Sequence, residues 1–285
     1  MTFLRLIRAK HYIKNTLVFM ALLCGGELFN ASKLRSSIVG FTVFCLISSA
    51  SYMVNDIRDL ENDRRHPVKS GRPVASGAVS VKGAAFTAIC MFTAGITINV
   101  FMLRPETVVY PVIYTAVNAA YSLGLKEQPI ADVAILAAGF AVRLFYGGSI
   151  TGIRISNWLF LTVLVFALYF ALGKRRNEIG MSERGETRSV LKYYTAEFLD
   201  KTMYMNLALG NAFYALWSID YNTTKHHNGR YMVYTMPVVL IITMRYSLVI
   251  EKDSDGDPVE VLFHDRTLMI LSLIYTALMI IILYA

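Results

Sequence analysis

Charged residues are scarce in this sequence. Asp, Glu, Lys and Arg make up 17% of its 285 residues, whereas 55% of the residues are hydrophobic, and the mean hydropathy is +0.47. Soluble globular domains carry roughly 25% charged residues. The shortage of charge therefore excludes a soluble globular protein and predicts a protein embedded in the membrane bilayer.

Cysteine is also rare, and several familiar site motifs are missing. The three cysteines, Cys24, Cys45 and Cys90, lie in apolar stretches, and their spacing fits neither a disulfide framework nor a metal site. The sequence has no serine nucleophile elbow, no Walker loop and no zinc-spaced set of His and Cys. Any catalytic chemistry is therefore expected from the charged loops.

Long apolar runs dominate what is present. A transmembrane helix needs about 20 apolar residues, and the N-terminal run is expected to be retained because it lacks a convincing small-residue cleavage site. We expect an all-α polytopic protein with a single membrane domain over residues 1–285. The nine predicted spans are 14–30, 37–54, 83–103, 106–123, 129–152, 156–173, 198–219, 231–249 and 267–285.

The basic residues predict the orientation of these spans. Of the 28 Lys and Arg, nineteen fall on one side of the predicted membrane, six on the other, and three within or at the edge of spans. Cytoplasmic loops retain positive charge, so the richer side is expected to face the cytoplasm. The net charge of +8 thus reflects topology, and no nucleic-acid partner is expected, because no basic domain lies outside the membrane.

A dense acidic cluster follows the second predicted span, in the stretch "NDIRDLENDRR". If that span continues as a helix, Asn55, Asp59 and Asp63 share one face, and Asp56 lies one position away. Carboxylates at this spacing repel one another unless a cation binds them, and Mg²⁺ prefers hard oxygen ligands. The pattern predicts a magnesium diphosphate site; the alternative is a charged loop that only solvates the helix ends.

Cationic side chains follow the acids directly. Such groups can hold phosphate oxygens, and a guanidinium can do so with two parallel hydrogen bonds. By contrast, Arg58 and Glu61 are assigned to the solvated face. The candidate phosphate donors are Arg64, Arg65, His66, Lys69 and Arg72.

The loop after the fourth predicted span adds Tyr121, Lys126 and Asp132 on the same side. Lys126 could bind a phosphate, and Asp132 could hold a second metal ion or orient a basic group. The alternative for Tyr121 and Lys126 is an interfacial anchor pair. Arg143, about three helical turns beyond Asp132, is either a substrate contact or half of an internal ion pair, because an ionised group within a span is costly.

Two further basic stretches have both a functional and a topological interpretation. "GKRRNE", which includes Lys174, is either a positive-inside stop signal or a binding site for an anionic substrate or lipid headgroup. "RAKHYIKN", which includes Arg8, His11, Lys14 and Asn15, has the same two interpretations.

With these residues identified, the chain resembles the UbiA-type intramembrane prenyltransferase superfamily, whose first signature reads N-D-x-x-D-x-x-x-D. Asn55, Asp56, Asp59 and Asp63 match this signature. The resemblance implies a nine-helix bundle with a cavity open to lipid and capped by cytoplasmic loops. "YSLGLK", the intramembrane "RLFYGG" and "GKRRNE" are further similar to the decaprenyl-phosphate phosphoribosyltransferases.

That similarity implies a transferase that moves 5-phosphoribose from phosphoribosyl pyrophosphate to a polyprenyl phosphate and releases pyrophosphate, on the route to the arabinan precursors of a cell wall. It also implies a multi-pass protein of the bacterial inner membrane. Prenyl transfer to an aromatic or other lipid acceptor is the alternative reaction, and transport is an alternative of another class. Whether the chain forms a homo-oligomer is left open.

The expected site combines these residues. Asp56, Asp59 and Asp63 are the expected catalytic group, and together with Asn55 they are the expected Mg²⁺ ligands. The expected substrate-binding residues are Lys14, Asn15, Asn55, Lys69, Arg72, Tyr121, Lys126, Asp132, Arg143 and Lys174.

Overall fold

The structure is a computed structural model that describes residues 2–66, 69–182, 189–225, 228–251 and 257–285. These residues form helices joined by turns and contain no strand, as the sequence predicts. Three residues that contribute to the predicted cytoplasmic charge, Arg184, Arg188 and Lys252, lie outside the described residues.

Six helical segments of the described chain are long and apolar enough to cross a membrane, and the protein is accordingly a multi-pass membrane protein. Each coincides with one of the predicted spans. The six are α3 (Ala31–Arg58), α5 (Val81–Met102), α7 (Ala131–Thr151), the first 23 residues of α8 (Asn157–Ser182), η6 (Gly229–Thr235) taken together with α11 (Met236–Glu251), and α13 (Arg266–Tyr284).

The other three predicted spans take different forms. Residues 14–30 contain the end of the 3₁₀ helix η1 (Ala9–Phe19) and the five-residue α2 (Met20–Cys24). α6 (Val109–Leu123) has only 15 residues, or roughly 22 Å of helix. α9 (Ala196–Ile219) has 24 residues but is not among the six apolar segments.

Shorter helices connect these elements. They include the segments that carry the charged loops, and none is long enough to span a bilayer. They are α1 (Thr2–Leu6), α4 (Leu60–Arg65), η2 (Lys69–Gly71), η3 (Pro105–Val108), η4 (Leu125–Glu127), η5 (Ser189–Tyr193), α10 (Tyr221–Thr224) and α12 (Pro258–His264).

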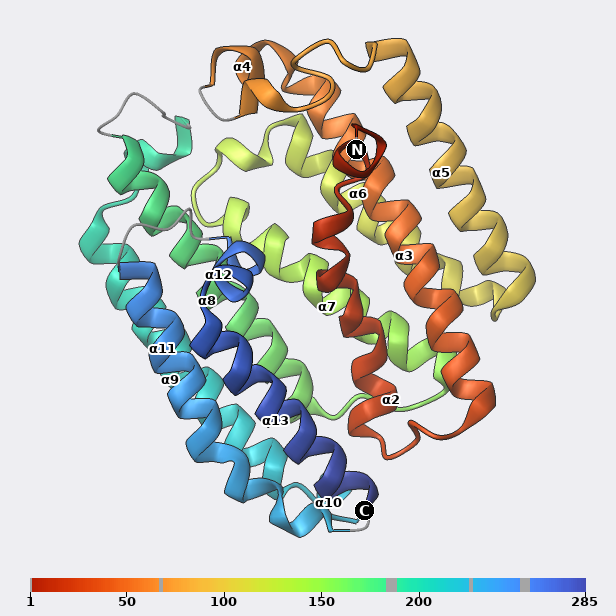
Figure 1. The fold of residues 1–285 in the computed structure, drawn as a ribbon, viewed down its shortest axis with the longest axis vertical. Coiled ribbons are helices and arrows are strands. Elements are labelled where there is room, and N and C mark those ends of the chain that lie inside the picture. The colour runs from red at the N-terminus through yellow and green to blue at the C-terminus, as the bar shows by residue number, and fades with distance from the viewer. Residues whose placement is uncertain (1, 67–68, 183–188, 226–227, 252–256) are drawn as a thin grey trace.

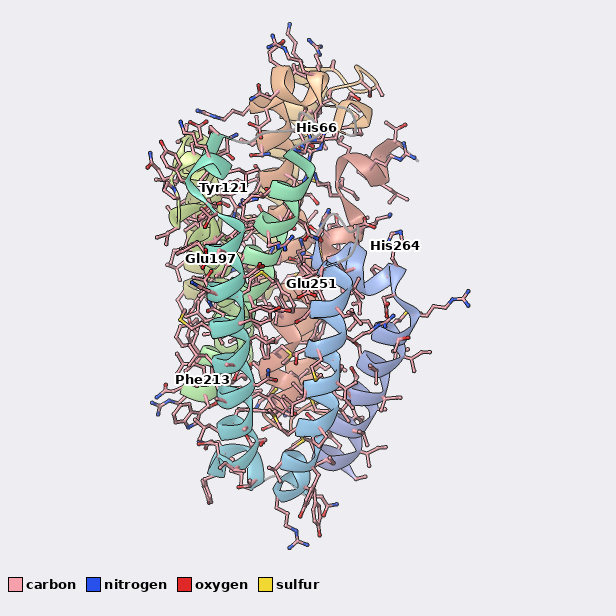
Figure 2. The ribbon with its side chains drawn as sticks, turned by 90° about the vertical axis from the view of Figure 1, so that its left-hand side faces the viewer. His66, Tyr121, Glu197, Phe213, Glu251 and His264 are labelled. Carbon is pink, nitrogen blue, oxygen red and sulfur yellow. The ribbon has the colours of Figure 1, made fainter. Side chains whose placement is uncertain are left out.

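The helices form two groups that meet along α7 and α8. α3 packs mainly against α5, α8 packs against α9, and α7 contacts η1, α3, α6 and α8. Figure 1 shows α9, α11 and α13 together on one side and α3 with α5 on the other. α4 and the N-terminus lie at one end of the bundle, and the C-terminus lies at the opposite end (Figure 1). The side view agrees, with His66 near the first end and Phe213 toward the second (Figure 2).

Close packing holds η1 between α3 and α7. Val18 of η1 is fully buried in a cluster with Phe44 and Tyr146. A Cβ atom at Gly147 would lie 2.2 Å from the carbonyl oxygen of Val18, so glycine is needed at this crossing. The N-terminal segment therefore enters the bundle and brings its polar residues next to α3 and α7.

Candidate active site

The acidic cluster lies where α3 ends and α4 begins. α3 runs from its Asn30 cap to Arg58, and Asp59, with φ −88° and ψ 8°, interrupts the helix before Leu60. The sequence predicted one continuous helical face for Asn55, Asp59 and Asp63. Because the helix is interrupted, these residues do not stay together. Asp63 contacts other side chains than Asn55 and Asp59 do.

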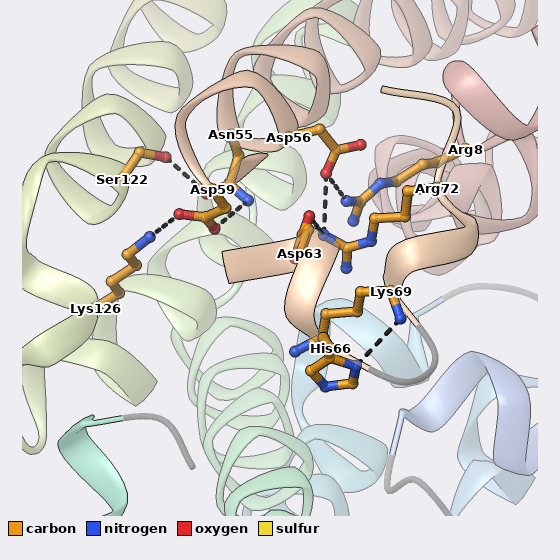
Figure 3. Close-up of polar contacts among 10 residues, drawn as sticks. All are labelled: Arg8, Asn55, Asp56, Asp59, Asp63, His66, Lys69, Arg72, Ser122 and Lys126. Carbon is orange, nitrogen blue, oxygen red and sulfur yellow. Dashed lines mark hydrogen bonds and ion pairs between the residues drawn. The ribbon is translucent and has the colours of Figure 1, made fainter. Parts of the chain in front are cut away.

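One set contains two buried carboxylates. Asp56 and Asp63 are 3% and 5% exposed. Nη1 of Arg72 donates to Oδ1 of Asp56 at 3.1 Å and to Oδ2 of Asp63 at 2.6 Å. Arg8 also donates to Oδ1 of Asp56 (Figure 3). Two carboxylate oxygens from different helices therefore converge on one cationic nitrogen.

The second set links α3 to the loop after α6. Nδ2 of Asn55 donates to Oδ2 of Asp59 at 3.0 Å, and the ammonium of Lys126 pairs with the other oxygen of Asp59 (Figure 3). Oγ of Ser122 donates to Oδ1 of Asn55 at 3.0 Å. The structure thus brings together the acidic cluster and Lys126, which lie 67 residues apart in the chain.

From the sequence, Arg8 was identified only as part of the basic stretch "RAKHYIKN", which had both a functional and a topological interpretation. Its backbone is in the left-handed region, with φ 53° and ψ 49°, at the turn between α1 and η1. An L-residue in this region is strained. Its guanidinium also lies over the ring of Tyr52, 4.9 Å from the centroid. No local pattern predicted this contact, because it depends on how the N-terminal segment folds back onto α3.

The other cations after the acidic cluster do not behave alike. Arg64 and Arg65 are exposed, and Arg64 pairs with the exposed Glu61 at 3.4 Å. The backbone N–H of Lys69 donates to Nδ1 of His66 at 3.1 Å (Figure 3). Arg72, by contrast, forms ion pairs with both Asp56 and Asp63.

Asp132 forms an ion pair with a buried arginine, a contact that fits the second of the two roles considered from the sequence. Asp132 and Arg175 are both 0% exposed, and Nε of Arg175 donates to Oδ2 of Asp132 at 2.6 Å. Nη1 of Arg175 donates to Glu178 at 2.6 Å, and Nη2 donates to the hydroxyl of Tyr121 at 3.3 Å. Arg175 therefore ties α8 to α7 and to the end of α6.

Tyr194 forms a hydrogen bond to the other oxygen of Asp132. Its hydroxyl donates to Oδ1 of Asp132 at 2.6 Å and accepts the backbone N–H of Ile130 at 2.6 Å. Burial, together with the hydrogen bond to Asp132, raises the pKa of Tyr194 to about 12. Ile130 has φ 70°, an unusual value for a β-branched residue. Both oxygens of Asp132 are therefore engaged by protein donors.

Arg143 has no carboxylate partner among the described residues. It is 3% exposed, and it donates to Oδ1 of Asn15 at 2.7 Å, to the carbonyl of Gly139 at 2.7 Å and to the hydroxyl of Tyr114 at 3.0 Å. Its guanidinium lies 4.6 Å from the centroid of the Tyr114 ring. The internal ion pair considered from the sequence is therefore absent from the described part of the chain, and neutral acceptors hold the charge.

Lys14 and Lys174 meet at a residue that the sequence did not single out. Their ammonium groups lie 3.2 and 3.3 Å from Oδ2 of Asp257. Asp257 caps the N-terminus of α12, a helix not predicted although the Asp-Pro pair that begins it is a helix-start signal. Burial opposes ionisation, but the two ammonium groups outweigh it and hold the pKa of Asp257 well below its usual value.

The carboxylates and their counter-charges suit a metal diphosphate. Asp56 and Asp63 already converge on a cationic position, and Asn55 and Asp59 supply further oxygens, which are hard ligands suited to Mg²⁺. Within the described residues, no three His, Cys, Asp or Glu side chains surround one point as metal ligands. The protein's own cations occupy the positions between the carboxylates.

The sequence of this chain is similar to those of known proteins. The sequence model of the UbiA prenyltransferase family matches residues 15–273. The decaprenyl-phosphate phosphoribosyltransferase of Corynebacterium glutamicum is 33% identical over 95% of this chain and 83% of its own length. The protein of the same name from Mycobacterium tuberculosis is 30% identical over 95% of this chain and 90% of its own.

Solved structures agree on the fold. A UbiA homologue from Archaeoglobus fulgidus, bound to GPP and Mg²⁺, superposes with a TM-score of 0.76, covers 99% of both chains and shares 18% sequence identity. The same homologue bound to DMAPP and Mg²⁺ gives a TM-score of 0.75.

Proposed function

Because the chain belongs to the UbiA prenyltransferase family, we propose that it transfers 5-phosphoribose from phosphoribosyl pyrophosphate to a polyprenyl phosphate. The observation that carries this proposal is the convergence of cations from three separate segments, Arg8, Arg72 and Lys126, on the carboxylates where α3 ends and α4 begins. A charged loop that only solvated helix ends would not gather distant cations in this way. The choice of donor follows the relatives, which carry the name decaprenyl-phosphate phosphoribosyltransferase.

The carboxylate group is the proposed site of Mg²⁺. Asp56, Asp59 and Asp63 would hold the ion, with Asn55 in support, and the bound ion would neutralise the charge of the pyrophosphate leaving group. Arg72 and Lys126, which pair with these acids in the structure, would then donate to phosphate oxygens. A guanidinium and an ammonium both suit that role.

The reaction itself requires positioning more than proton transfer. The bond between the anomeric carbon and the pyrophosphate oxygen breaks, and pyrophosphate leaves with the electron pair. An oxygen of the ionised polyprenyl phosphate forms the new bond to that carbon, through an oxocarbenium-like state. Because the acceptor is already an anion, Lys14, Lys174, Arg143 and Asn15 would serve mainly to hold it in line, while Tyr121 and Lys69 would contact either substrate.

The topology completes the proposal. We assign one catalytic domain over residues 1–285, nine membrane crossings and an active site that faces the cytoplasm of a bacterial inner membrane. The excess of Lys and Arg on the side of the carboxylate loop supports this orientation. α6, although short, α9, and η1 with α2 would complete the crossings beyond the six apolar segments.

Prenyl transfer is the second candidate. It is favoured by the structural likeness to a UbiA homologue bound to GPP and Mg²⁺. Both reactions use the same leaving group, but an allylic donor needs apolar or aromatic walls where a sugar needs hydroxyl contacts.

The test offers purified protein two donor and acceptor pairs with Mg²⁺. Labelled phosphoribosyl pyrophosphate with decaprenyl phosphate is expected to give a labelled lipid, and geranylgeranyl diphosphate with candidate acceptors is expected to give none. Asp59→Ala should reduce turnover about a hundredfold or more. Glu61→Gln, an exposed acid two residues away, is the matched control. Product only from the prenyl donor would refute the proposal.

A further inference from the structure

Lys14, Lys174 and Asp257 form a second charged group, distinct from the carboxylates where α3 ends and α4 begins. The two lysines come from η1 and from the last part of α8, and Asp257 comes from the start of α12. Both ammonium nitrogens lie within 3.3 Å of the same oxygen, Oδ2 of Asp257. Two like charges are therefore held side by side, an arrangement that is unfavourable without the carboxylate between them.

Asp257 is the fixed member of this group. Its other oxygen accepts the backbone N–H of Val259 at 3.0 Å, which caps α12. Val259 and Val261 are 4% and 2% exposed, so the helix behind the carboxylate is packed into the protein. A second contact, Lys10 to Glu260 at 3.6 Å, also links η1 to α12. The side chains of Lys14 and Lys174 are more exposed than that of Asp257. The carboxylate therefore orients the lysines.

The two ammonium groups share one carboxylate oxygen. His11 beside them is neutral at pH 7, because burial, aided by Lys14, lowers the pKa of His11 to about 4. The two cations can therefore face an anion together while the carboxylate keeps them in place. A carboxylate held by its own helix cap is poorly suited to leave when a phosphate arrives, so competition with the ligand is the less favoured role.

The position of Lys14 indicates which anion. The next residue, Asn15, is fully buried and accepts a hydrogen bond from Arg143 inside the bundle. Lys14 therefore marks the point where the charged layer meets the membrane-spanning part. A phosphate attached to a polyprenyl chain reaches the protein at that depth, whereas a water-soluble donor arrives from the loop side.

We propose that Asp257 is a positioning residue that holds Lys14 and Lys174 together as the binding pair for the phosphate of the polyprenyl acceptor. This assignment rests on the proposed phosphoribosyl transfer. It gives the acceptor its own pair of cations, distinct from Arg72 and Lys126 at the carboxylates. It also explains why a short helix outside the six apolar segments is docked by ion pairs against the N-terminal segment.

The experiment compares Asp257→Asn with Asp265→Asn. Asparagine keeps the size of the side chain and an oxygen for the helix cap, and removes the charge. Asp265 is a matched control, because it caps α13 through Leu268 and pairs with Arg245 at 2.6 Å. For each variant we would measure kcat, the KM of each substrate, the thermal midpoint, and the binding of farnesyl phosphate without donor.

The expected result is specific to the acceptor. Asp257→Asn should weaken farnesyl phosphate binding and raise the KM for polyprenyl phosphate at least tenfold, with the KM for phosphoribosyl pyrophosphate within twofold of wild type. Lys14→Gln should reproduce this pattern, Asp257→Glu should restore part of the affinity, and Asp265→Asn should leave both constants within twofold. If Asp257→Asn does not fold, the acceptor and donor constants of Lys14→Gln are compared with those of Asp265→Asn.

Four outcomes would overturn the assignment. Two concern the affinity of Asp257→Asn for farnesyl phosphate: it is unchanged, or it becomes tighter, which would make Asp257 a competitor of the phosphate. The third is that Asp257→Asn changes the KM for phosphoribosyl pyrophosphate in place of the acceptor constants. The fourth is that Asp265→Asn changes the acceptor constants as much as Asp257→Asn does. Failure of the proposed reaction gives a different result, in which the wild type binds farnesyl phosphate in an Asp257-dependent way but transfers no phosphoribose.

Discussion

Two neighbouring arginines on α8 allow a direct test of how burial changes the strength of an ion pair. Arg175 pairs with Asp132 at 2.6 Å, and both side chains are 0% exposed. Arg176 pairs with Asp200 at 3.0 Å, with side chains 33% and 40% exposed. Both pairs join an arginine of α8 to an aspartate, but they differ in burial, and the buried pair also contacts Glu178, Tyr121 and Tyr194.

The expected magnitudes follow from the environment of each pair. Removing one partner of a buried pair costs about 3–5 kcal/mol, because the remaining charge is left without compensation. Arg175 keeps Glu178 at 2.6 Å, so Asp132→Asn should fall near the lower end, about 3 kcal/mol. Asp200→Asn should cost no more than about 1 kcal/mol, because water screens a partly exposed pair.

The measurement is a pair of double-mutant cycles. Asp132→Asn is combined with Arg175→Met and Asp200→Asn with Arg176→Met, and the free energy of unfolding is followed in mixed micelles of increasing SDS content. The coupling in the buried pair should be several times that in the exposed pair. Equal couplings, or a cost below about 1 kcal/mol for Asp132→Asn, would refute the reasoning.

The same variant separates the two roles considered for Asp132. Since both of its oxygens accept hydrogen bonds from Arg175 and Tyr194, Asp132→Asn should leave the Mg²⁺ concentration for half-maximal activity within twofold of wild type. A large rise in that concentration would show that Asp132 binds metal.

Three further predictions concern other parts of the site. Arg72→Ala should raise the KM for phosphoribosyl pyrophosphate at least tenfold in steady-state kinetics, because this arginine bridges two carboxylates at the proposed donor site, whereas Arg65→Ala, at an exposed position, should change it less than twofold. The loss of unfolding free energy in Asp257→Asn should be constant between about pH 6 and 8. This loss should shrink below about pH 4. The pKa of Asp257 is depressed in the folded state, so the ionised carboxylate stabilises the fold above the unfolded-state pKa, and this stabilisation disappears as the pH falls. A loss of unfolding free energy that grows in acid would contradict the prediction. Tyr194→Phe should lower the free energy of unfolding by about 1–3 kcal/mol, because Asp132 and the N–H of Ile130 both lose a partner, and an unchanged denaturation midpoint would contradict that role.

The sequence predicted the helical class, six of the spans and the residues of the acidic cluster. It did not predict how the cluster divides, because the expected face assumed an uninterrupted helix through Asp59. The pairing of Asp56 with Arg8, and of Asp59 with Lys126, joins segments far apart in the chain. Local spacing carries no information about such contacts.

Basic stretches at span ends were the least predictable. "GKRRNE" places three cations in succession, and the structure gives each a different partner. Lys174 pairs with Asp257, Arg175 is fully buried with Asp132, and Arg176 pairs with Asp200 at a half-buried position. Helical periodicity could have separated Arg175 from its neighbours, since it follows the buried Ala171 and Leu172 on the same side. Its acidic partners depended on the tertiary fold.

Arg143 has a consequence for how the protein enters the membrane. An arginine near the middle of a span opposes insertion by about 2.5–3.5 kcal/mol. Its guanidinium donates hydrogen bonds to Asn15, Tyr114 and Gly139, all of which are synthesised before Arg143. The guanidinium can therefore find its hydrogen-bond acceptors as soon as α7 leaves the ribosome. The N-terminal half can then assemble in the order in which it is made, before α8 to α13 are synthesised.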